Sequence, residues 1–458
     1  MLPNLKDTIA AIATPSGQGA VGIVRLSGPE SLPIARKIFR PQRKEVVFES
    51  HKMIYGKIYD DMRLIDEVLV CYMAPPNSFT GEAVVEIFGH GGTFVMSQLL
   101  AVALKGGARL ACPGEFSYRA VLYGKIDLTQ AEAIADVIEA KNNQALSVAQ
   151  NNLNGLFSKE VKALREKLVE MLAHMEAEID FSTEEIEEET LSVRKQKLSE
   201  IVKRISDMLK AYQLGQRLYH GVTVVICGRP NVGKSSLLNA ILKRDRAIVS
   251  DCPGTTRDTL EETIHYRGIS VSFIDTAGIR ETHSKLEQIG VSLAYEKLKY
   301  ADLKLLVLDS SQSLTQEDLR LCEEMASPQT IFVQNKSDLN QHSLFQVALK
   351  PFSSIKRIPI CALKREGIDT LLNMIYEQII EKELETDTIF LMKERHRLGL
   401  EQAIQSLSAC EKGMEAHLSM EFLTVDLKKA IESLETVVGR VTEEDIYDKI
   451  FSTFCIGK

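Results

Sequence analysis

Residues 228–235 read GRPNVGKS, and they stand between an apolar run, VTVVIC (222–227), and a segment of helical character. The spacing matches the pattern G-x-x-x-x-G-K-[ST], in which glycines let backbone N–H groups turn inward around phosphate oxygens. The amino terminus of the following helix adds a partial positive charge. In this pattern Lys234 reaches the outer phosphates and Ser235 coordinates Mg²⁺. The stretch therefore predicts a strand, a phosphate-binding loop and a helix.

Three later segments identify the base. Asp275, in DTAG, follows the apolar run VSFI and is placed to hold the water shell of Mg²⁺. Asp338, in NKSD, can accept hydrogen bonds from N1–H and the 2-amino group of guanine, which adenine does not offer. Cys361, in CAL, stands where the last guanine-contacting loop usually has serine, and the backbone N–H groups of that loop can still serve. The order and spacing predict GTP as the nucleotide.

The predicted GTP contacts lie in the phosphate loop, the first switch AIVSDCPGTTRD (247–258), the DTAG segment that leads into the second switch IRETHSKLEQIG (279–290), and the two guanine-contacting loops. They are Asn231, Val232, Gly233, Lys234, Ser235, Ser236, Ser250, Asp251, Cys252, Pro253, Gly254, Thr255, Thr256, Asp275, Thr276, Ala277, Gly278, Asn335, Lys336, Asp338, Cys361 and Ala362.

Hydrolysis of GTP needs a group that orients the attacking water. In Ras-like enzymes this group is a glutamine directly after DxxG, but here the position holds Ile279, which cannot do so. Another residue must hold the water, and Glu287 in the second switch is an acidic candidate. Thr256 of the first switch is positioned to bind Mg²⁺ together with Ser235. Asn231 offers a side-chain oxygen for a monovalent cation.

The bulk composition fits a multidomain globular protein. The chain has 458 residues, of which 45% are hydrophobic and 26% charged, and a length prior gives about three domains. Its net charge of -8 argues against a protein that functions mainly by binding nucleic acid non-specifically. Any RNA-binding surface must therefore be a local patch or be shared with a partner. The eight cysteines are dispersed, which argues against disulfides and structural zinc. No leader and no apolar run of about 18 residues is evident, so a cytoplasmic protein without a membrane span is expected.

The pattern of apolar residues, which predicts strands or helices, changes three times along the sequence. Residues 1–118 carry short apolar runs such as AVGIVRLSG and predict a mixed α/β domain. Residues 119–216 are helical, and the apolar spacing from Leu128 to Phe181 predicts one long helix or a helical pair. Residues 217–381 alternate strands and helices, typical of a largely parallel sheet. Residues 382–458 are helical again, so the α/β segment is predicted to be inserted into a helical domain.

The chain resembles the MnmE (TrmE) family of bacterial tRNA-modification GTPases over essentially its whole length. The carrying segments are DTIAAIATPSGQGAVGIVRLSG, PPNSFTGEAVVEIFGHGG, PGEFSYRAVLYGKIDLTQAEAIADVI, GRPNVGKSS, GTTRD, DTAGIR, NKSD and the terminal FCIGK. The resemblance implies an N-terminal folate-binding dimerisation domain and a helical domain interrupted by a Ras-like P-loop GTPase domain. It also implies potassium-stimulated GTP hydrolysis in a homodimer whose G domains pair. The implied partner is an FAD-containing MnmG-type protein, with which the enzyme adds an aminomethyl or carboxymethylaminomethyl group to C5 of the wobble uridine in tRNA.

The resemblance also assigns residues. Position by position it implies K⁺ ligands at Asn231, Ser250, Cys252 and Thr255, and catalytic roles for Glu287, Arg257 and Asp258. The implied contacts of a reduced folate, 5-formyl- or 5,10-methylene-tetrahydrofolate, are Arg25, Glu86, Lys125 and Lys458. A folate presents pterin N–H donors at one end and carboxylates at the other, so an acceptor and cations suit it. Without the resemblance, these charges would be read as solvated surface. His90, in FGHGG, is expected to be a turn histidine with a structural hydrogen bond.

The chain ends FSTFCIGK, and its cysteine invites comparison with a lipid-attachment signal. A prenylation box requires two aliphatic residues after the cysteine and a different last residue, whereas Cys455 is followed by Ile456, Gly457 and Lys458. The tail matches the C-x-G-K ending of the family, so Cys455 is predicted to be a site residue. The sequence leaves open whether it acts as a nucleophile or packs.

A second hypothesis is a GTP-switched interaction protein, such as a ribosome-assembly factor. That hypothesis predicts no folate affinity and a recognisable RNA-binding module. The flanks of the G domain contain no evident KH-type GxxG, which counts against it.

Overall fold

The structure, a computed structural model, describes residues 6–43, 46–180, 190–245, 261–275, 301–379, 393–439, 450–452, 454 and 457. It divides into two compact units. The first unit comprises residues 1–138, 150–202 and 398–458, and the second comprises residues 139–149 and 203–397. The first unit is thus assembled from chain segments on both sides of the second, as the predicted insertion requires.

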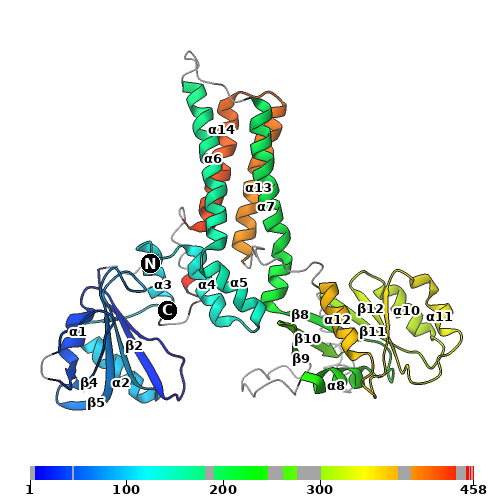
Figure 1. Cartoon of the computed structure of the whole chain (residues 1–458), viewed down its shortest axis with the longest axis horizontal. Helices are drawn as coiled ribbons and strands as arrows, with labels where there is room; N and C mark the ends of the chain where they lie inside the picture. Colours follow the sequence, from blue (N-terminus) through cyan, green and yellow to red (C-terminus); the bar gives the residue numbers. More distant parts are fainter. Residues whose placement is uncertain are drawn as a thin grey trace, which may run out of the picture. The chain divides into compact units, whose positions relative to one another are not determined.

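A seven-stranded sheet forms the N-terminal part of the first unit, in the order β3-β4-β5-β6-β2-β1-β7 (Figure 1). Its neighbours pair antiparallel except β1 and β7, which are parallel. The predicted runs AVGIVRLSG, EVLVCYM and AVVEIFG supply β2, β5 and β6. The strands are β1 (Ile9–Ile12), β2 (Val21–Ser27), β3 (Phe39–Pro41), β4 (Met53–Asp60), β5 (Arg63–Met73), β6 (Val84–His90) and β7 (Arg109–Leu110).

The two faces of this sheet have different covers. Helices α1 (Ser31–Ile38) and α2 (Thr93–Lys105) pack on the face that carries Val24 and Ile87. The opposite face carries Ala11, which packs with Phe116 of α3 (Glu115–Leu122). Side chains alternate between the two faces of a sheet along each strand. Arg25, next to Val24, and Glu86, next to Ile87, therefore lie on the face covered by α3.

The segment from Leu128 to Asp180 forms three helices, α4 (Leu128–Glu139), α5 (Asn143–Leu153) and α6 (Leu156–Asp180), so the prediction of one helix or a pair was wrong. Two local features interrupt the pattern. The side-chain oxygen of Asn142 accepts a hydrogen bond from the backbone N–H of Ala145 at 2.8 Å, which favours a new helix start. Gly155 has a φ of 80°, which ends α5.

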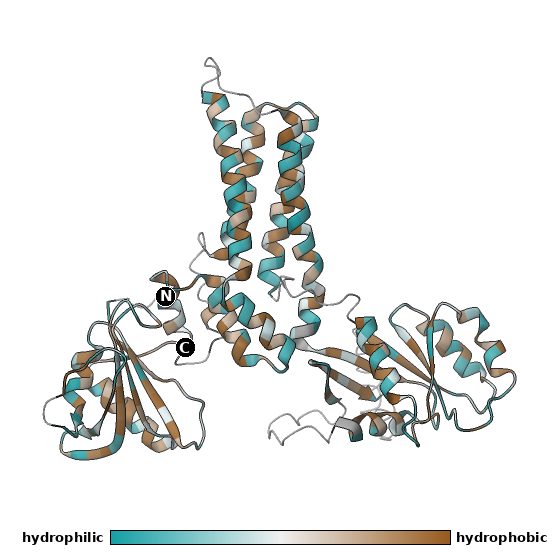
Figure 2. Cartoon of the chain, viewed as in Figure 1, coloured by the Kyte–Doolittle hydropathy of each residue, from teal (hydrophilic) through white to brown (hydrophobic). Residues whose placement is uncertain are grey.

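Long helices form the rest of the first unit. α6 packs against α14 (Met420–Val438), where Arg165 Nε donates to Glu435 Oε1 at 2.6 Å. The first-unit parts of α7 (Leu191–His220) and α13 (Glu394–Glu415) are joined by an ion pair between Lys195 and Glu415. α7 is also tied to α6 by the nearly buried pair Arg194–Glu178. Brown and teal alternate along these helices, as expected for helices with one buried face (Figure 2).

The second unit contains a six-stranded sheet in the order β13-β12-β11-β8-β10-β9. All its pairs are parallel except β10 with β9, which confirms the predicted largely parallel sheet. The antiparallel edge strand, β9, was missed because its sequence, EETIHY, carries few apolar residues. The strands are β8 (Val222–Cys227), β9 (Glu261–Tyr266), β10 (Ile269–Asp275), β11 (Leu303–Asp309), β12 (Thr330–Asn335) and β13 (Lys356–Pro359).

The described helices between β8 and residue 379 are α8 (Lys234–Asp245), α10 (Gln316–Met325), α11 (Phe345–Ala348), the 3₁₀ helix η2 (Lys350–Phe352) and α12 (Ile368–Ile379). Parts of α5, α7 and α13 also belong to the second unit. Two of the predicted domain limits, at residues 118/119 and 216/217, fall inside helices, namely α3 and α7. In the described part of the chain, no helix is long and apolar enough to cross a membrane. Six cysteines are described, none of them in a disulfide, and four are buried.

Candidate functional site

The phosphate loop lies between β8 and α8, as predicted. Gly228 has a φ of 141° and Gly233 a φ of 99°, and even Asn231 has a φ of 63°. A Cβ on Gly228 would lie 2.5 Å from the carbonyl oxygen of Val307, and one on Gly233 would lie 2.3 Å from Asn335 Nδ2. Both glycines are therefore required by conformation and by space, because side chains are strongly disfavoured at such φ values.

Lys234 and Ser235 stand at the amino terminus of α8. Lys234 is only 6% exposed, and its Nζ donates to the carbonyl oxygens of Gly228 and Arg229, each at 2.9 Å. Its ammonium is thus held against the loop that would receive the phosphates. Ser235 Oγ donates to Asp275 Oδ2 at 3.0 Å. A hydroxyl beside a carboxylate is a donor set that suits Mg²⁺, and the two residues fit that ion.

Asn335 joins three segments of the site. Its Nδ2 donates to the carbonyl oxygen of Val232 in the phosphate loop at 2.8 Å. Its Oδ1 accepts from the backbone N–H of Ala362 at 3.1 Å. The residue is 3% exposed, so both bonds are shielded from water. The asparagine of NKSD therefore fixes the phosphate loop relative to the loop that follows β13.

Asp309 is a residue of the site that was not predicted from the sequence. Lys336 has a φ of 63°, and its Nζ donates to Asp309 Oδ2 at 2.6 Å. Burial would raise the pKa of Asp309, but the hydrogen bonds from Lys336 and Ser311 outweigh it and lower that pKa. Asp309 ends β11, which lies between β8 and β12, and the carboxyl ends of parallel strands meet at one edge of the sheet. An aspartate directly after the run LKLLVL was the available signal.

Asp338 stands beside Cys361. The hydrogen bond from the Cys361 thiol lowers the pKa of Asp338 most, and Lys364, whose Nζ lies 3.3 Å from Asp338 Oδ2, lowers it further. An ionised carboxylate accepts two hydrogen bonds, as the guanine edge demands. Cys361 is buried, and its Sγ accepts from the backbone N–H of Lys364 at 3.4 Å. The cysteine at this position therefore donates to Asp338 and accepts within its own loop.

The remaining predicted site residues lie outside the described residues. They are Ser250, Asp251, Cys252, Pro253, Gly254, Thr255, Thr256, Arg257, Asp258, Thr276, Ala277, Gly278, Glu287, Cys455 and Lys458. Ser236, which is described, lies exposed in the first turn of α8.

Arg25 and Glu86 form a second candidate site, on the α3 face of the N-terminal sheet. They are directly opposite each other in the β2–β6 ladder, and Arg25 Nε donates to Glu86 Oε1 at 2.8 Å. The guanidinium carbon lies 5.9 Å from the centre of the Phe79 ring and 5.8 Å from that of Phe116. Cys71 of β5 is opposite Glu86, and burial, aided by Glu86, raises the pKa of its thiol.

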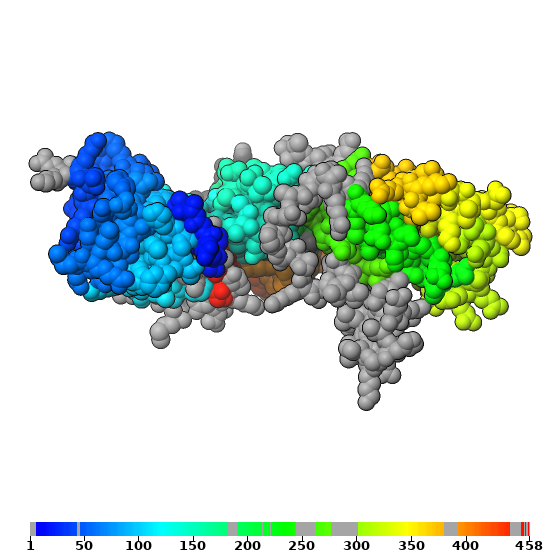
Figure 3. Space-filling model, turned by 90° about the horizontal axis from the view of Figure 1, so that it is seen from below, coloured from blue at the N-terminus to red at the C-terminus, as the bar shows by residue number. Residues whose placement is uncertain are grey.

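Lys125 and the tail of the chain belong to the same unit. Lys125 Nζ donates to the carbonyl oxygen of Pro76 at 2.8 Å, in the loop that leads to Phe79. Gly457, with a φ of 99°, lies against the end of β1, where an added Cβ would be 2.3 Å from the carbonyl oxygen of Ile12. Arg25 Nη1 donates to the carbonyl oxygen of Gly457 at 3.4 Å. Figure 3 shows the end of the chain in red beside the dark-blue N-terminal segment.

The chemistry of this second site fits a reduced folate. Glu86 supplies a carboxylate that can accept from pterin N–H groups, and Lys125 supplies a cation for the glutamate end. The two phenylalanine rings beside Arg25 give an apolar, aromatic surround that suits a planar ring. Arg25 and Glu86 are neither fully solvated nor fully buried, with side chains 21% and 16% exposed.

His90 ends β6 and makes the structural hydrogen bond that was predicted. Its Nδ1 lies 2.7 Å from Asp66 Oδ1, and its backbone N–H donates to Asp66 Oδ2 at 2.8 Å. The hydrogen bond with Asp66 raises the pKa of His90 above its ordinary value. The residue ends a strand, where a turn position was expected.

Comparisons with known proteins point to one family along nearly the whole chain. A family model described as the MnmE helical domain matches residues 128–455, and one described as the GTP-binding protein TrmE N-terminus matches residues 8–125. The tRNA modification GTPase MnmE of Clostridioides difficile is 43% identical over 457 residues, which is 99% of this chain and 100% of that protein. The protein of the same name from Aquifex aeolicus is 42% identical over 456 residues, with the same coverage of 99% and 100%.

A solved structure of Era from Aquifex aeolicus, bound to GDP.AlF4-, is 28% identical over 40% of this chain and 66% of that one, with a TM-score of 0.28. The family assignment rests on the family models and on the full-length relatives. These matches establish that this chain belongs to the MnmE family of tRNA modification GTPases.

Proposed function

We propose that this chain is a GTP-hydrolysing enzyme that modifies tRNA. The observation that carries the proposal is the joined nucleotide site, in which Asn335 links the phosphate loop to the loop of Ala362 while Asp338 stays ionised beside them. A site built this way selects guanine through Asp338 and holds phosphates at Lys234. The curated relatives that match the full length of the chain are named tRNA modification GTPases, which supports tRNA as the substrate. We place the reaction in the cytoplasm.

We propose that Mg²⁺ and K⁺ act together in hydrolysis. Ser235, with Thr256, would hold Mg²⁺, which neutralises charge on the phosphates, while Asp275 holds its water shell. Asn231, with Ser250, Cys252 and Thr255, would hold K⁺. Asn231 is exposed in a loop conformation of positive φ, which leaves its side-chain oxygen available. Glu287 would orient the attacking water in place of the missing glutamine.

Arg257 and Asp258 would act from the first switch when two G domains pair. The pairing makes the active species a homodimer, and K⁺ supplies the positive charge that a Ras-like enzyme obtains from an arginine.

We further propose that the N-terminal site binds a reduced folate, 5-formyl- or 5,10-methylene-tetrahydrofolate, through Arg25, Glu86, Lys125 and Lys458. The folate would supply the one-carbon unit that is added to C5 of the wobble uridine, and ammonium or glycine would supply the nitrogen, so that tetrahydrofolate leaves with the C5 proton. The carbon of 5-formyl-tetrahydrofolate would in addition need two electrons, from the reduced FAD of the partner. The FAD-containing MnmG-type partner would complete the reaction in a heterotetramer-type complex. Cys455 belongs to the same tail as Gly457, which lies beside Arg25, and this supports a role for the tail at this site.

The deciding experiment compares GTP hydrolysis in K⁺ and in Na⁺ at equal ionic strength. We expect strong stimulation by K⁺, abolished by Asn231→Ala and sharply reduced by Glu287→Ala. ATP should not be hydrolysed, and Asp338→Asn should shift the preference from guanosine to xanthosine triphosphate, because the amide donates where the carboxylate accepted. Equal rates in both salts would remove the K⁺ mechanism and leave the GTPase itself intact.

The tRNA reaction has a separate test. The full chain, mixed with an MnmG-type protein, GTP, 5-formyl- or 5,10-methylene-tetrahydrofolate and ammonium or glycine as the source of nitrogen, should add mass to a tRNA at its wobble uridine. A chain that hydrolyses GTP but neither binds the folate nor changes the tRNA would instead be a GTP-switched interaction protein.

A further inference from the structure

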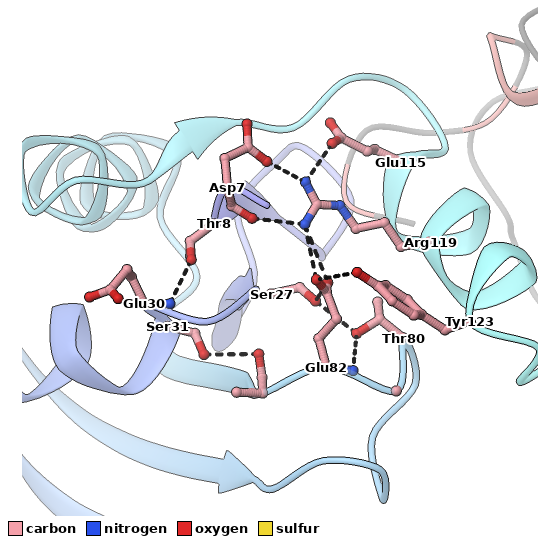
Figure 4. A network of polar contacts seen from close by, with 12 residues as sticks. Asp7, Thr8, Ser27, Glu30, Ser31, Thr80, Glu82, Glu115, Arg119 and Tyr123 are labelled. Atoms are coloured by element: carbon pink, nitrogen blue, oxygen red, sulfur yellow. Dashed lines mark hydrogen bonds and ion pairs between the residues drawn. The ribbon is translucent and has the colours of Figure 1, made fainter. Parts of the chain in front are cut away.

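An ion cluster lies at α3, and the buried Arg119 of that helix is at its centre (Figure 4). Arg119 is 0% exposed. Its Nη2 donates to Asp7 Oδ1 at 2.6 Å and to Glu115 Oε1 at 3.0 Å. Its Nη1 donates to the carbonyl oxygen of Asp7 at 2.9 Å and lies 3.3 Å from both carboxylate oxygens of Glu82. A buried guanidinium is tolerated only with such partners, so the cluster fixes all four residues relative to one another.

Glu82 links the cluster to the loop that carries Phe79. Ser27 Oγ of β2 donates to Glu82 Oε2 at 2.8 Å and lies 2.7 Å from Thr80 Oγ1. Ser27 and Thr80 are both 0% exposed. Tyr123 at the end of α3 donates to Glu82 Oε1 at 3.4 Å. The loop before β6 is thus attached to the sheet on one side and to α3 on the other.

The elements attached in this way are the ones that surround Arg25. The loop carries Phe79, and α3 carries Phe116 at its first turn, directly after Glu115. Lys125 follows α3 and donates to Pro76 in the same loop. None of these three side chains is among the hydrogen-bond partners of Arg119 given above, yet their positions depend on the elements that Arg119 joins.

We propose that Arg119 is a positioning residue for the folate site. It holds α3 and the 74–82 loop in one arrangement, in which Phe79 and Phe116 flank Arg25 and Lys125 stands over the loop. This inference rests on the proposed binding of a reduced folate. It goes further, because it assigns the shape of that site to a residue that the ligand does not touch.

Arg109 offers a matched control. Its Nε donates to Asp7 Oδ2 and its Nη2 to Glu115 Oε1, each at 2.7 Å, so it shares two carboxylates with Arg119. Its described hydrogen bonds do not include Glu82 or any other residue of the loop. Loss of Arg109 therefore weakens the cluster without detaching the loop from α3.

The test measures binding of 5-formyl-tetrahydrofolate by calorimetry to the full chain and to three variants: Arg119→Lys, Ser27→Ala and Arg109→Lys. Lysine keeps the charge of Arg119 but, as a point donor, cannot span three carboxylates. Ser27→Ala removes both hydrogen bonds that attach the loop to β2 and changes little volume, so it decides the matter if Arg119→Lys does not fold. GTP hydrolysis reports the integrity of the second unit, and circular dichroism reports folding.

We expect Arg119→Lys and Ser27→Ala to bind the folate at least about tenfold more weakly, and Arg109→Lys to bind within about threefold of the unaltered chain. GTP hydrolysis should be the same in all four proteins. Folded Arg119→Lys that binds as tightly as the unaltered chain would overturn the inference, as would equal losses in Arg109→Lys and Arg119→Lys. If the unaltered chain itself binds no folate, the folate part of the proposed function fails, and the inference fails with it.

Discussion

Asn335 carries more of the nucleotide site than its place in a short motif indicates. Asn335→Ala would leave the carbonyl oxygen of Val232 and the N–H of Ala362 without their partners in a site where Asn335 is 3% exposed. Two buried polar groups left unpaired cost about 2–6 kcal/mol together. We expect the unfolding free energy of the second unit to fall by about this amount in urea titration, and the affinity for GDP to fall with it.

Asn335→Asp is the matched variant for this prediction. Its carboxylate still accepts from Ala362 but cannot donate to Val232. The unfolding free energy should therefore fall by more than in a surface substitution, and the phosphate loop should be the first segment to lose its native position. An unchanged unfolding free energy in Asn335→Ala would mean that water replaces both partners at no cost.

His90 gives a prediction about pH. Its pKa is raised above the ordinary value of 6.5, mainly by the hydrogen bond with Asp66. A raised pKa in the folded state adds stability that is fully present below pH 6.5 and is lost as the pH rises through the raised value. The difference in unfolding free energy between the unaltered chain and His90→Gln should therefore be larger at about pH 5.5 than at about pH 9. Since the side chain is 72% exposed, salt should reduce it. A difference that grows with pH would contradict this reading.

Individual residues were predictable where a motif dictates chemistry. The spacing of Gly228, Gly233 and Lys234 placed the phosphate loop, because few other arrangements let a backbone turn around phosphate. Arg119 was not predictable, since an arginine in a helical pattern reads as a surface charge and only the fold brings three carboxylates around it. Asp309 was missed for a related reason, because its partner Lys336 directly follows another strand, β12.

At the scale of elements, the tail segment that contains Gly457 packs closely against the end of β1. An alanine there would need a φ of 99° and would place its Cβ 2.3 Å from the carbonyl oxygen of Ile12. Gly457→Ala should therefore release the tail from the end of β1, and carboxypeptidase should remove the C-terminal residues faster. Gly107→Ala is the control, because Gly107 has a φ of 120° but no atom within 4 Å of an added Cβ. Equal digestion rates in the two variants would mean that the close approach at Ile12 does not hold the tail.

Elements were predictable in kind more than in number. The continuous apolar sequences of β8, β11 and β12 predict buried parallel strands. In the structure these three strands do pair in parallel. The helical stretch from Leu128 was predicted as one helix or two because its apolar spacing continues across the breaks. The breaks depend on single residues, Asn142 and Gly155, whose effect is local and does not disturb the periodicity.

At the scale of the whole molecule, the two units should respond to different ligands. Calorimetry of the full chain should resolve two unfolding transitions. GDP at about 100 times its dissociation constant should stabilise one of them by roughly 2.7 kcal/mol, and 5-formyl-tetrahydrofolate should act on the other in the same way. Asn335→Ala should reduce only the GDP shift, and Ser27→Ala only the folate shift. A single transition moved equally by both ligands would contradict the independence of the two units.

The hydrogen bond between Arg25 and Gly457 joins residues that are 432 positions apart. A ribosome that adds 5–20 residues per second needs roughly 20–90 s to make that stretch of chain. The second unit, whose residues are all complete by position 397, can fold while synthesis continues. The N-terminal sheet receives its contact from Gly457 only after that residue has emerged from the ribosome. During translation, therefore, all residues of the nucleotide site are available before Gly457 can contact the N-terminal sheet.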